Sequence, residues 1–205
     1  MLVTLALLLA AAPASARSAT LLVLGDSLSA EYGLPRDSGW VKLLADRIAH
    51  EAPQYSVVNA SISGDTTSGG RARLGQLLER HHPAVVIIEL GANDGLRGLS
   101  VEAMRANLQT MIDACRGHGA RVLLVGIHVP PNYGTVYGER FYAVYGDLAR
   151  RNHLAEVPFL LDGFADRLEW FQADRMHPLP QAQPTMLGNV WPHLQPLLEP
   201  AARVH

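Results

Sequence analysis

Two short segments near opposite ends of the chain carry side chains that together could perform nucleophilic catalysis. Gly25-Asp26-Ser27-Leu28 directly follows an apolar run, and Asp174-Arg175-Met176-His177-Pro178 lies far downstream. A serine hydroxyl attacks a carbonyl only when a base takes its proton, and an imidazole is well suited to that task near neutral pH. Asp174 precedes His177 by three residues and could orient and stabilise the imidazole, as the carboxylate does in serine-protease triads. Ser27, Asp174 and His177 are therefore candidates for acyl transfer.

Two further loops offer hydrogen-bond donors for the negative oxygen that develops during acyl transfer. Gly64, within Ser61-Ile62-Ser63-Gly64-Asp65, provides a backbone amide without an adjoining side chain. Asn93, within Gly91-Ala92-Asn93-Asp94-Gly95, provides a side-chain amide. Together with the Ser27 amide they predict an oxyanion hole with three donors. Gly-Asp-Ser and Gly-x-Asn-Asp are also common turn sequences, so the prediction depends on their joint order along the chain.

Strands and helices that would position these loops alternate along the sequence. Short apolar runs predict strands, and apolar residues at helical spacing predict helices. The expected strands are 20–25, 55–60, 84–90, 121–127 and 157–161, and the expected helices are 39–52, 65–81, 101–116, 137–152 and 183–198. Pro184, Pro192 and Pro196 predict interruptions in the last helix. Because the strands are almost continuously apolar, we expect an α/β protein whose parallel sheet is covered by helices on both faces.

Composition limits the classes of function. The 205 residues are 48% hydrophobic and 18% charged, which indicates a globular chain of about one domain. A formal net charge of −2 gives no basic surface for nucleic acid. The nine histidines and one cysteine show no zinc-ligand spacing, so no metal is expected. Cys115 cannot form an intramolecular disulfide, and we expect it to be a small buried hydrophobic residue.

The N-terminus has the pattern of a secretory signal peptide. Residues 2–12 are almost wholly apolar, and Ala14-Ser15-Ala16 fits a cleavage site. We therefore expect residues 1–16 to be removed and residues 17–205 to form a single domain, located in the periplasm or secreted, without stable membrane insertion. A buried or membrane-anchoring helix is the alternative, because no Lys or Arg precedes the apolar run.

Taken together, the four loops resemble the conserved blocks of the GDSL, or SGNH, hydrolase family. The resemblance covers residues 20–200: the first block matches Gly25 to Ser29, the second Gly64, the third Gly91 to Asp94, and the last Asp174 to Pro178. It implies a three-layer α/β/α sandwich with a flavodoxin-like parallel sheet. It also assigns the nucleophile to Ser27, the other triad members to Asp174 and His177, and the oxyanion hole to Ser27, Gly64 and Asn93.

Three further segments resemble the branch of this family that contains periplasmic thioesterase I, lysophospholipases and arylesterases. They are residues 58–66, 89–98 and 131–134. This resemblance implies hydrolysis of acyl esters and thioesters, including fatty acyl-CoA and lysophospholipids, without a cofactor. A carbohydrate acetylesterase of the same family is the alternative enzyme, and a non-catalytic exported binding domain is the alternative from another class.

Overall fold

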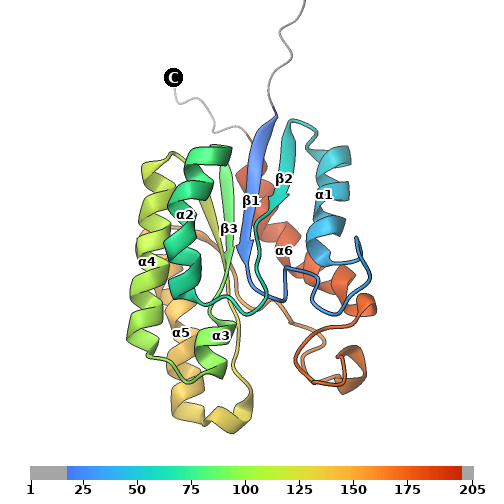
Figure 1. The fold of residues 1–205 in the computed structure, drawn as a ribbon, viewed down its shortest axis with the longest axis vertical. Helices are drawn as coiled ribbons and strands as arrows, with labels where there is room; N and C mark the ends of the chain where they lie inside the picture. Colours follow the sequence, from blue (N-terminus) through green and yellow to red (C-terminus); the bar gives the residue numbers. More distant parts are fainter. Residues whose placement is uncertain (1–17, 200–205) are drawn as a thin grey trace, which may run out of the picture.

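The computed structural model describes residues 18–199, so the predicted signal peptide lies outside the described residues. A parallel sheet forms the centre of the molecule (Figure 1). Its strands are β1 (Ala19–Gly25), β2 (Tyr55–Asn59), β3 (Val85–Glu89), β4 (Arg121–Val125) and β5 (Ala155–Val157). The helices are α1 (Trp40–Glu51), α2 (Thr67–His81), α3 (Ala92–Leu96), α4 (Val101–Gly117), α5 (Thr135–Asn152) and α6 (Gln183–Leu198), and short 3₁₀ turns occupy Pro131–Tyr133, Leu168–Trp170 and Pro180–Ala182.

The sheet has the strand order β2-β1-β3-β4-β5, and each neighbouring pair is parallel. Helices α1 and α6 pack together on one face, whereas α2, α4 and α5 cover the other (Figure 1). The predicted three-layer α/β/α sandwich of flavodoxin type is therefore confirmed. In this order the chain leaves β1 toward β2 on one side and later returns to β3 on the other. The carboxyl ends of β1 and β3 flank this switch point, where open α/β sheets bind ligands.

Burial explains why the central strands read as continuous apolar runs. All five residues of β3 are buried, and so are the last five residues of β1. One hydrophobic cluster joins both faces of the sheet to the helices and includes Trp40, Phe141 and Leu194. Cys115 is also buried there, as the sequence predicts. This cluster fixes the strand ends from which the four predicted loops leave. No helix within residues 18–199 is long and apolar enough to cross a membrane.

Two predicted elements differ from the structure at the end of the chain. The fifth strand occupies Ala155–Val157 instead of 157–161, because Pro158 has no amide hydrogen for a sheet ladder. Leu160, which made the later range look like a strand, is buried in the core outside the sheet. Helix α6 continues through Pro192 and Pro196, which were predicted to interrupt it. Both prolines lie on its exposed face, where water can bond the freed carbonyls, while the opposite face is buried.

The loop after β3 also differs from the prediction, because it contains a short helix that the sequence did not suggest. Residues Ala92–Leu96 form α3, directly after Gly91. Helix α2 begins at Thr67 with Thr66 as its N-cap, one residue later than the predicted Asp65. Asp65 is thereby left free to accept other hydrogen bonds beside the site.

Candidate active site

The nucleophile turn begins where β1 ends. The Asp26 carbonyl accepts hydrogen bonds from the Ser29 and Ala30 amides, and the Asp26 carboxylate accepts one from the Leu28 amide at 3.0 Å. These bonds fold the chain tightly around Ser27. Its side chain is half-buried at the carboxyl edge of the sheet, beside the switch point.

A closed loop presents Asp174 and His177 to this turn. Its two ends are joined by an antiparallel bridge between Phe171 and Pro178. Within it, the Gln172 amide donates to the His177 carbonyl at 2.8 Å. The Asp174 carboxylate accepts from the His177 amide at 3.0 Å. The backbone therefore holds both side chains on the same side of one turn.

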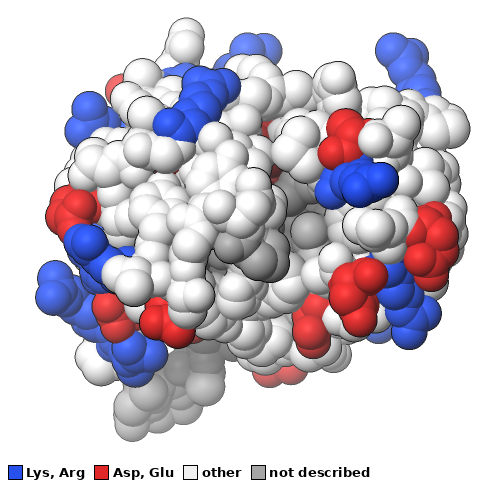
Figure 2. All heavy atoms as spheres, turned by 90° about the horizontal axis from the view of Figure 1, so that it is seen from below, with Lys and Arg blue, Asp and Glu red and all other residues white. Residues whose placement is uncertain are grey.

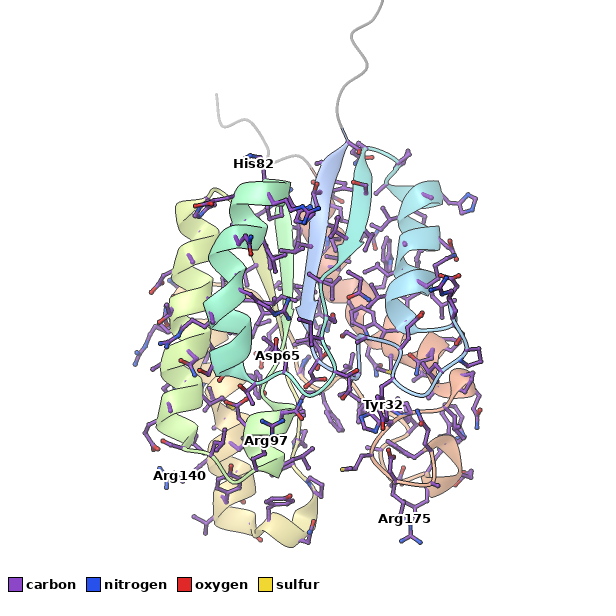
Figure 3. The ribbon with its side chains drawn as sticks, in the orientation of Figure 1. Tyr32, Asp65, His82, Arg97, Arg140 and Arg175 are labelled. Carbon is purple, nitrogen blue, oxygen red and sulfur yellow. The ribbon has the colours of Figure 1, made fainter. Side chains whose placement is uncertain are left out.

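The three predicted side chains form one continuous chain of hydrogen bonds. His177 Nδ1 lies 2.6 Å from Asp174 Oδ2, and His177 Nε2 lies 2.9 Å from Ser27 Oγ. The Tyr32 ring rests against the imidazole, with a centroid separation of 4.4 Å, and Figure 3 shows Tyr32 beside this loop. The Tyr32 carbonyl also accepts from the Gln172 side chain at 2.8 Å, which ties the His177 loop to the nucleophile loop.

Asp174 is held in its ionised form. Partial desolvation raises the pKa of its carboxyl, but hydrogen bonds from the His177 ring and from the Met176 and His177 amides outweigh this effect. The pKa of Asp174 therefore lies below its usual range. An ionised carboxylate at Nδ1 directs the lone pair of Nε2 toward the serine hydroxyl, which is the orientation a general base needs.

Two residues that line the same cavity have backbone amides with no acceptor within residues 18–199. Among the hydrogen bonds of residues 18–199, neither the Ser27 amide nor the Gly64 amide donates to another protein group. Gly64 has a φ of 81°, a conformation that side-chain-bearing residues rarely adopt. Both residues line the same cavity as His177. The predicted amide donors are thus brought together at one place.

Asn93 also lines this cavity, but its amide group is engaged with protein acceptors. Its nitrogen donates to Asp26 Oδ2 at 3.1 Å and to the Asp65 carbonyl at 2.9 Å. Asp65 is fixed in turn by a salt bridge to Arg73 at 2.8 Å. The sequence therefore predicted the position of Asn93 but not the acceptors that hold it.

Beneath the turn lies a buried carboxyl pair that sequence reasoning missed. Glu89, at the end of β3, is fully buried, and its Oε2 accepts from Ser29 Oγ at 2.6 Å and from the Asp26 amide at 3.4 Å. Gly25 is required beside it, because an added Cβ would lie 2.8 Å from Glu89 Oε2. The available signal was a single carboxylate ending an otherwise apolar strand.

Burial changes the acidity of both carboxyl groups. Desolvation raises the pKa of Asp26 to about 7, despite hydrogen bonds from Leu28 and Asn93 that lower it. Desolvation, together with the nearby charge of Asp26, raises the pKa of Glu89 well above its usual range. Its Oε1 is buried without a hydrogen-bond partner within residues 18–199. The folded protein therefore holds the Glu89 proton to a higher pH than the unfolded chain does.

The side chains open into a cavity of about 860 Å³. Its wall is mainly apolar and includes Leu28, Ile127, Phe159, Leu161 and Phe171. Such a wall accommodates hydrocarbon, while the few polar groups at its mouth orient a reacting carbonyl. No cluster of three or more metal-ligating His, Cys, Asp or Glu side chains occurs within residues 18–199.

A parallel α/β/α fold that aligns a serine hydroxyl, an imidazole and a carboxylate at a strand end defines the class of serine hydrolases. Residues 23–183 match the family described as GDSL-like lipase/acylhydrolase. The chain belongs to this family and is a carboxylic ester hydrolase.

Characterised relatives cover nearly the whole sequence. Esterase TesA of Pseudomonas aeruginosa is 53% identical over 194 residues, which span 95% of this chain and 96% of that protein. Thioesterase 1/protease 1/lysophospholipase L1 of Escherichia coli K12 is 41% identical, over 90% of this chain and 87% of the relative.

The fold is likewise similar to solved structures. The crystal structure of TesA superposes with a TM-score of 0.84 at 53% identity and covers 87% of this chain and 99% of its own. The psychrotrophic esterase EstA from Pseudoalteromonas sp., solved with monoethylphosphonate as inhibitor, gives a TM-score of 0.81 at 39% identity, over 87% of this chain and 98% of its own.

The raised pKa of Glu89 leads to a test by pH-dependent stability. Below about pH 4.5 the carboxyl is protonated in both folded and unfolded chains. As the pH rises further, the unfolded chain loses this proton before the folded protein does, so stability falls until the pH passes the raised pKa of the folded protein. Glu89→Gln resembles the neutral acid and removes this dependence. We expect the decline in unfolding free energy above pH 4.5 to become shallower, by at most about 1.4 kcal/mol per pH unit, measured by urea denaturation.

Glu169→Gln is the matched control, because it removes the same charge from an exposed side chain. This control should retain the wild-type pH slope. Equal slopes in wild type and Glu89→Gln would mean that folding does not raise the pKa of Glu89.

Proposed function

We propose that this chain hydrolyses acyl esters and thioesters by a two-step transfer through an acyl-enzyme on Ser27. The observation that carries the proposal is the hydrogen-bonded chain from Asp174 through His177 to Ser27, with bonds of 2.6 and 2.9 Å, at the mouth of an apolar cavity.

In the first step His177 Nε2 takes the Ser27 proton as Oγ attacks the acyl carbonyl. The tetrahedral intermediate collapses when the imidazolium returns its proton to the leaving alcohol, and a thiolate leaves with less assistance. In the second step water attacks the acyl-enzyme, and His177 accepts the proton of that water. The bond between Ser27 Oγ and the acyl carbon then breaks as the imidazolium returns this proton to Oγ. Asp174 stabilises the imidazolium in both steps, and the free acid is then released.

The negative oxygen of each intermediate is held by the amides of Ser27 and Gly64 and by the side chain of Asn93. The two backbone amides have no acceptor within residues 18–199, which supports their role. Asn93 contributes by sharing one of its hydrogens between Asp26 and the oxyanion. The contact with the Asp65 carbonyl keeps the amide in place during this exchange.

The substrates we propose are small molecules with an acyl chain, such as fatty acyl-CoA, lysophospholipids and aryl or alkyl esters. The apolar wall of the cavity supports an acyl group. Relatives named esterase, arylesterase and thioesterase 1/lysophospholipase L1 support the ester and thioester classes.

Export is part of the proposal. Residues 1–16 act as a cleaved signal peptide, and residues 17–205 act as one domain in the periplasm or outside the cell. The apolar run of residues 2–12 and the Ala14-Ser15-Ala16 pattern support this location.

Replacement of the nucleophile tests the reaction directly. For Ser27→Ala we expect kcat on p-nitrophenyl butyrate to fall by about 10⁴-fold or more, because no other group can form the acyl-enzyme. Ser68→Ala, which removes an exposed hydroxyl from α2, should retain wild-type turnover. Hydrolysis by Ser27→Ala at the wild-type rate would refute the assignment.

A second variant tests the side-chain donor. Asn93→Ala should lower kcat by roughly 10²- to 10³-fold with a smaller change in KM, because the bond to the oxyanion strengthens mainly in the transition state. Asn132→Ala, an exposed amide outside the cavity, serves as the control. If Asn93→Ala raised KM and left kcat unchanged, Asn93 would be a substrate-binding residue only.

The signal peptide can be tested in a Gram-negative host that expresses the full chain. The mature protein should appear in the periplasmic fraction or the medium. Its intact mass should match residues 17–205, because cleavage follows Ala16. Leu8→Arg should block export by placing a charge in the apolar run, whereas Leu8→Ile should not. An exported protein that still begins at Met1 would contradict cleavage.

A further inference from the structure

Exposed apolar side chains gather at one end of the molecule. Within residues 18–199, six large hydrophobic residues are exposed, and all lie in segments that follow the carboxyl ends of strands. Each of the five strands is followed by at least one of them. We call this set the apolar rim; its members are Tyr32, Ile62, Leu99, Val136, Leu168 and Met176. Single exposed hydrophobic residues are ordinary, but a scattered set would also occupy the other faces.

Half of the apolar rim has no contact with the cavity. Tyr32, Leu168 and Met176 line it, whereas Ile62, Leu99 and Val136 do not. Val136 is nevertheless the most exposed member, at 73%, and Leu99 is 42% exposed. Binding of one dissolved substrate molecule in the cavity therefore does not explain why these side chains are apolar.

Charged side chains are also distributed unevenly at this end of the molecule. Figure 2 views this end of the molecule and shows uncharged side chains over most of its middle, with acidic and basic side chains mostly around the margin. Figure 3 places Arg97 and Arg175 at this end and His82 at the opposite end, and the Arg175 side chain points away from the protein. An uncharged centre with arginines beside it matches the layers of a phospholipid surface, in which hydrocarbon lies beneath phosphate groups.

We propose that the apolar rim docks on a phospholipid surface, so that acyl substrates pass from the lipid into the cavity without crossing water. This inference rests on the proposed acyl hydrolysis and specifies where the substrate is taken up. Tyr32, Leu168 and Met176 of the rim line the cavity that contains Ser27, so a second protein seated on the rim would cover the site. A lipid surface instead supplies the acyl chain that the cavity wall accommodates, and the chain stays in apolar surroundings during transfer.

The test uses two rim residues that do not line the cavity and have no proposed catalytic role. Leu99→Gln combined with Val136→Gln removes their apolar character and leaves the backbone bonds of Leu99 intact. We expect the wild-type protein to float with phosphatidylcholine vesicles and the double variant to bind about tenfold more weakly. Because the contact is mainly apolar, wild-type binding should persist in about 0.5 M salt, which largely screens interactions between surface charges.

A relocation control separates this surface from general hydrophobicity. Gln54→Leu and His118→Leu, added to the double variant, restore two large apolar side chains at exposed positions near the amino ends of β2 and β4. Binding should stay weak. Recovery of binding, an unchanged affinity of the double variant, or absence of wild-type binding would each overturn the proposal. So would a wild-type dimer that the double variant dissociates in sedimentation velocity, because the rim would then be an interface between copies.

Activity on a soluble ester distinguishes this inference from the proposed function. All variants should hydrolyse p-nitrophenyl butyrate in lipid-free buffer at the wild-type rate, since neither Leu99 nor Val136 lines the cavity. A wild-type protein that binds vesicles but hydrolyses no ester would contradict the proposed function and leave the apolar rim supported. Ester hydrolysis without vesicle binding would support the proposed function and contradict docking of the apolar rim.

Discussion

The hydrogen bond between His177 and Ser27 is the contact on which the rest of the site depends. It joins residues that are 150 positions apart, so it exists only because the sheet and its loops bring the two ends of the chain to one edge. On one side the bonds to Asp26 fix the turn after β1. On the other side the bridge from Phe171 to Pro178 closes the loop around His177.

A buried carboxyl pair beneath this contact orders the site but lowers the stability of the folded protein. Asp26 and Glu89 are both fully buried, so desolvation and the repulsion between their charges make ionising both groups unfavourable. The same groups bond Ser29, Leu28 and the Asn93 side chain. Stability is therefore lost where the nucleophile turn and the oxyanion loop are held together, as is common for functional sites. An apolar residue in place of Glu89 would leave the Ser29 hydroxyl buried without this acceptor.

Much of this arrangement could be predicted from the sequence, because strong local patterns coincide with it. Residues close together in the sequence are enough to recognise the apolar runs of β1 and β3 and the short spacing from Asp174 to His177. The end of β5 was predicted wrongly although Pro158 marks it in the sequence. The continuity of α6 was predicted wrongly because burial of one helix face outweighs the two prolines on the exposed face. The bonds of Asn93 to Asp26 and Asp65, and the position of Glu89 under Gly25, join segments distant in sequence. No local pattern records such contacts.

The measurement that tests the account most directly is covalent labelling with a fluorophosphonate probe, followed by peptide mass mapping. Such a probe reacts with a serine whose hydroxyl is activated by a base and whose oxyanion donors are in place. The account predicts a single adduct, on the peptide that contains Ser27, and its loss when His177 is replaced by Gln. An adduct on another serine, or equal labelling of Ser27 without His177, would contradict it.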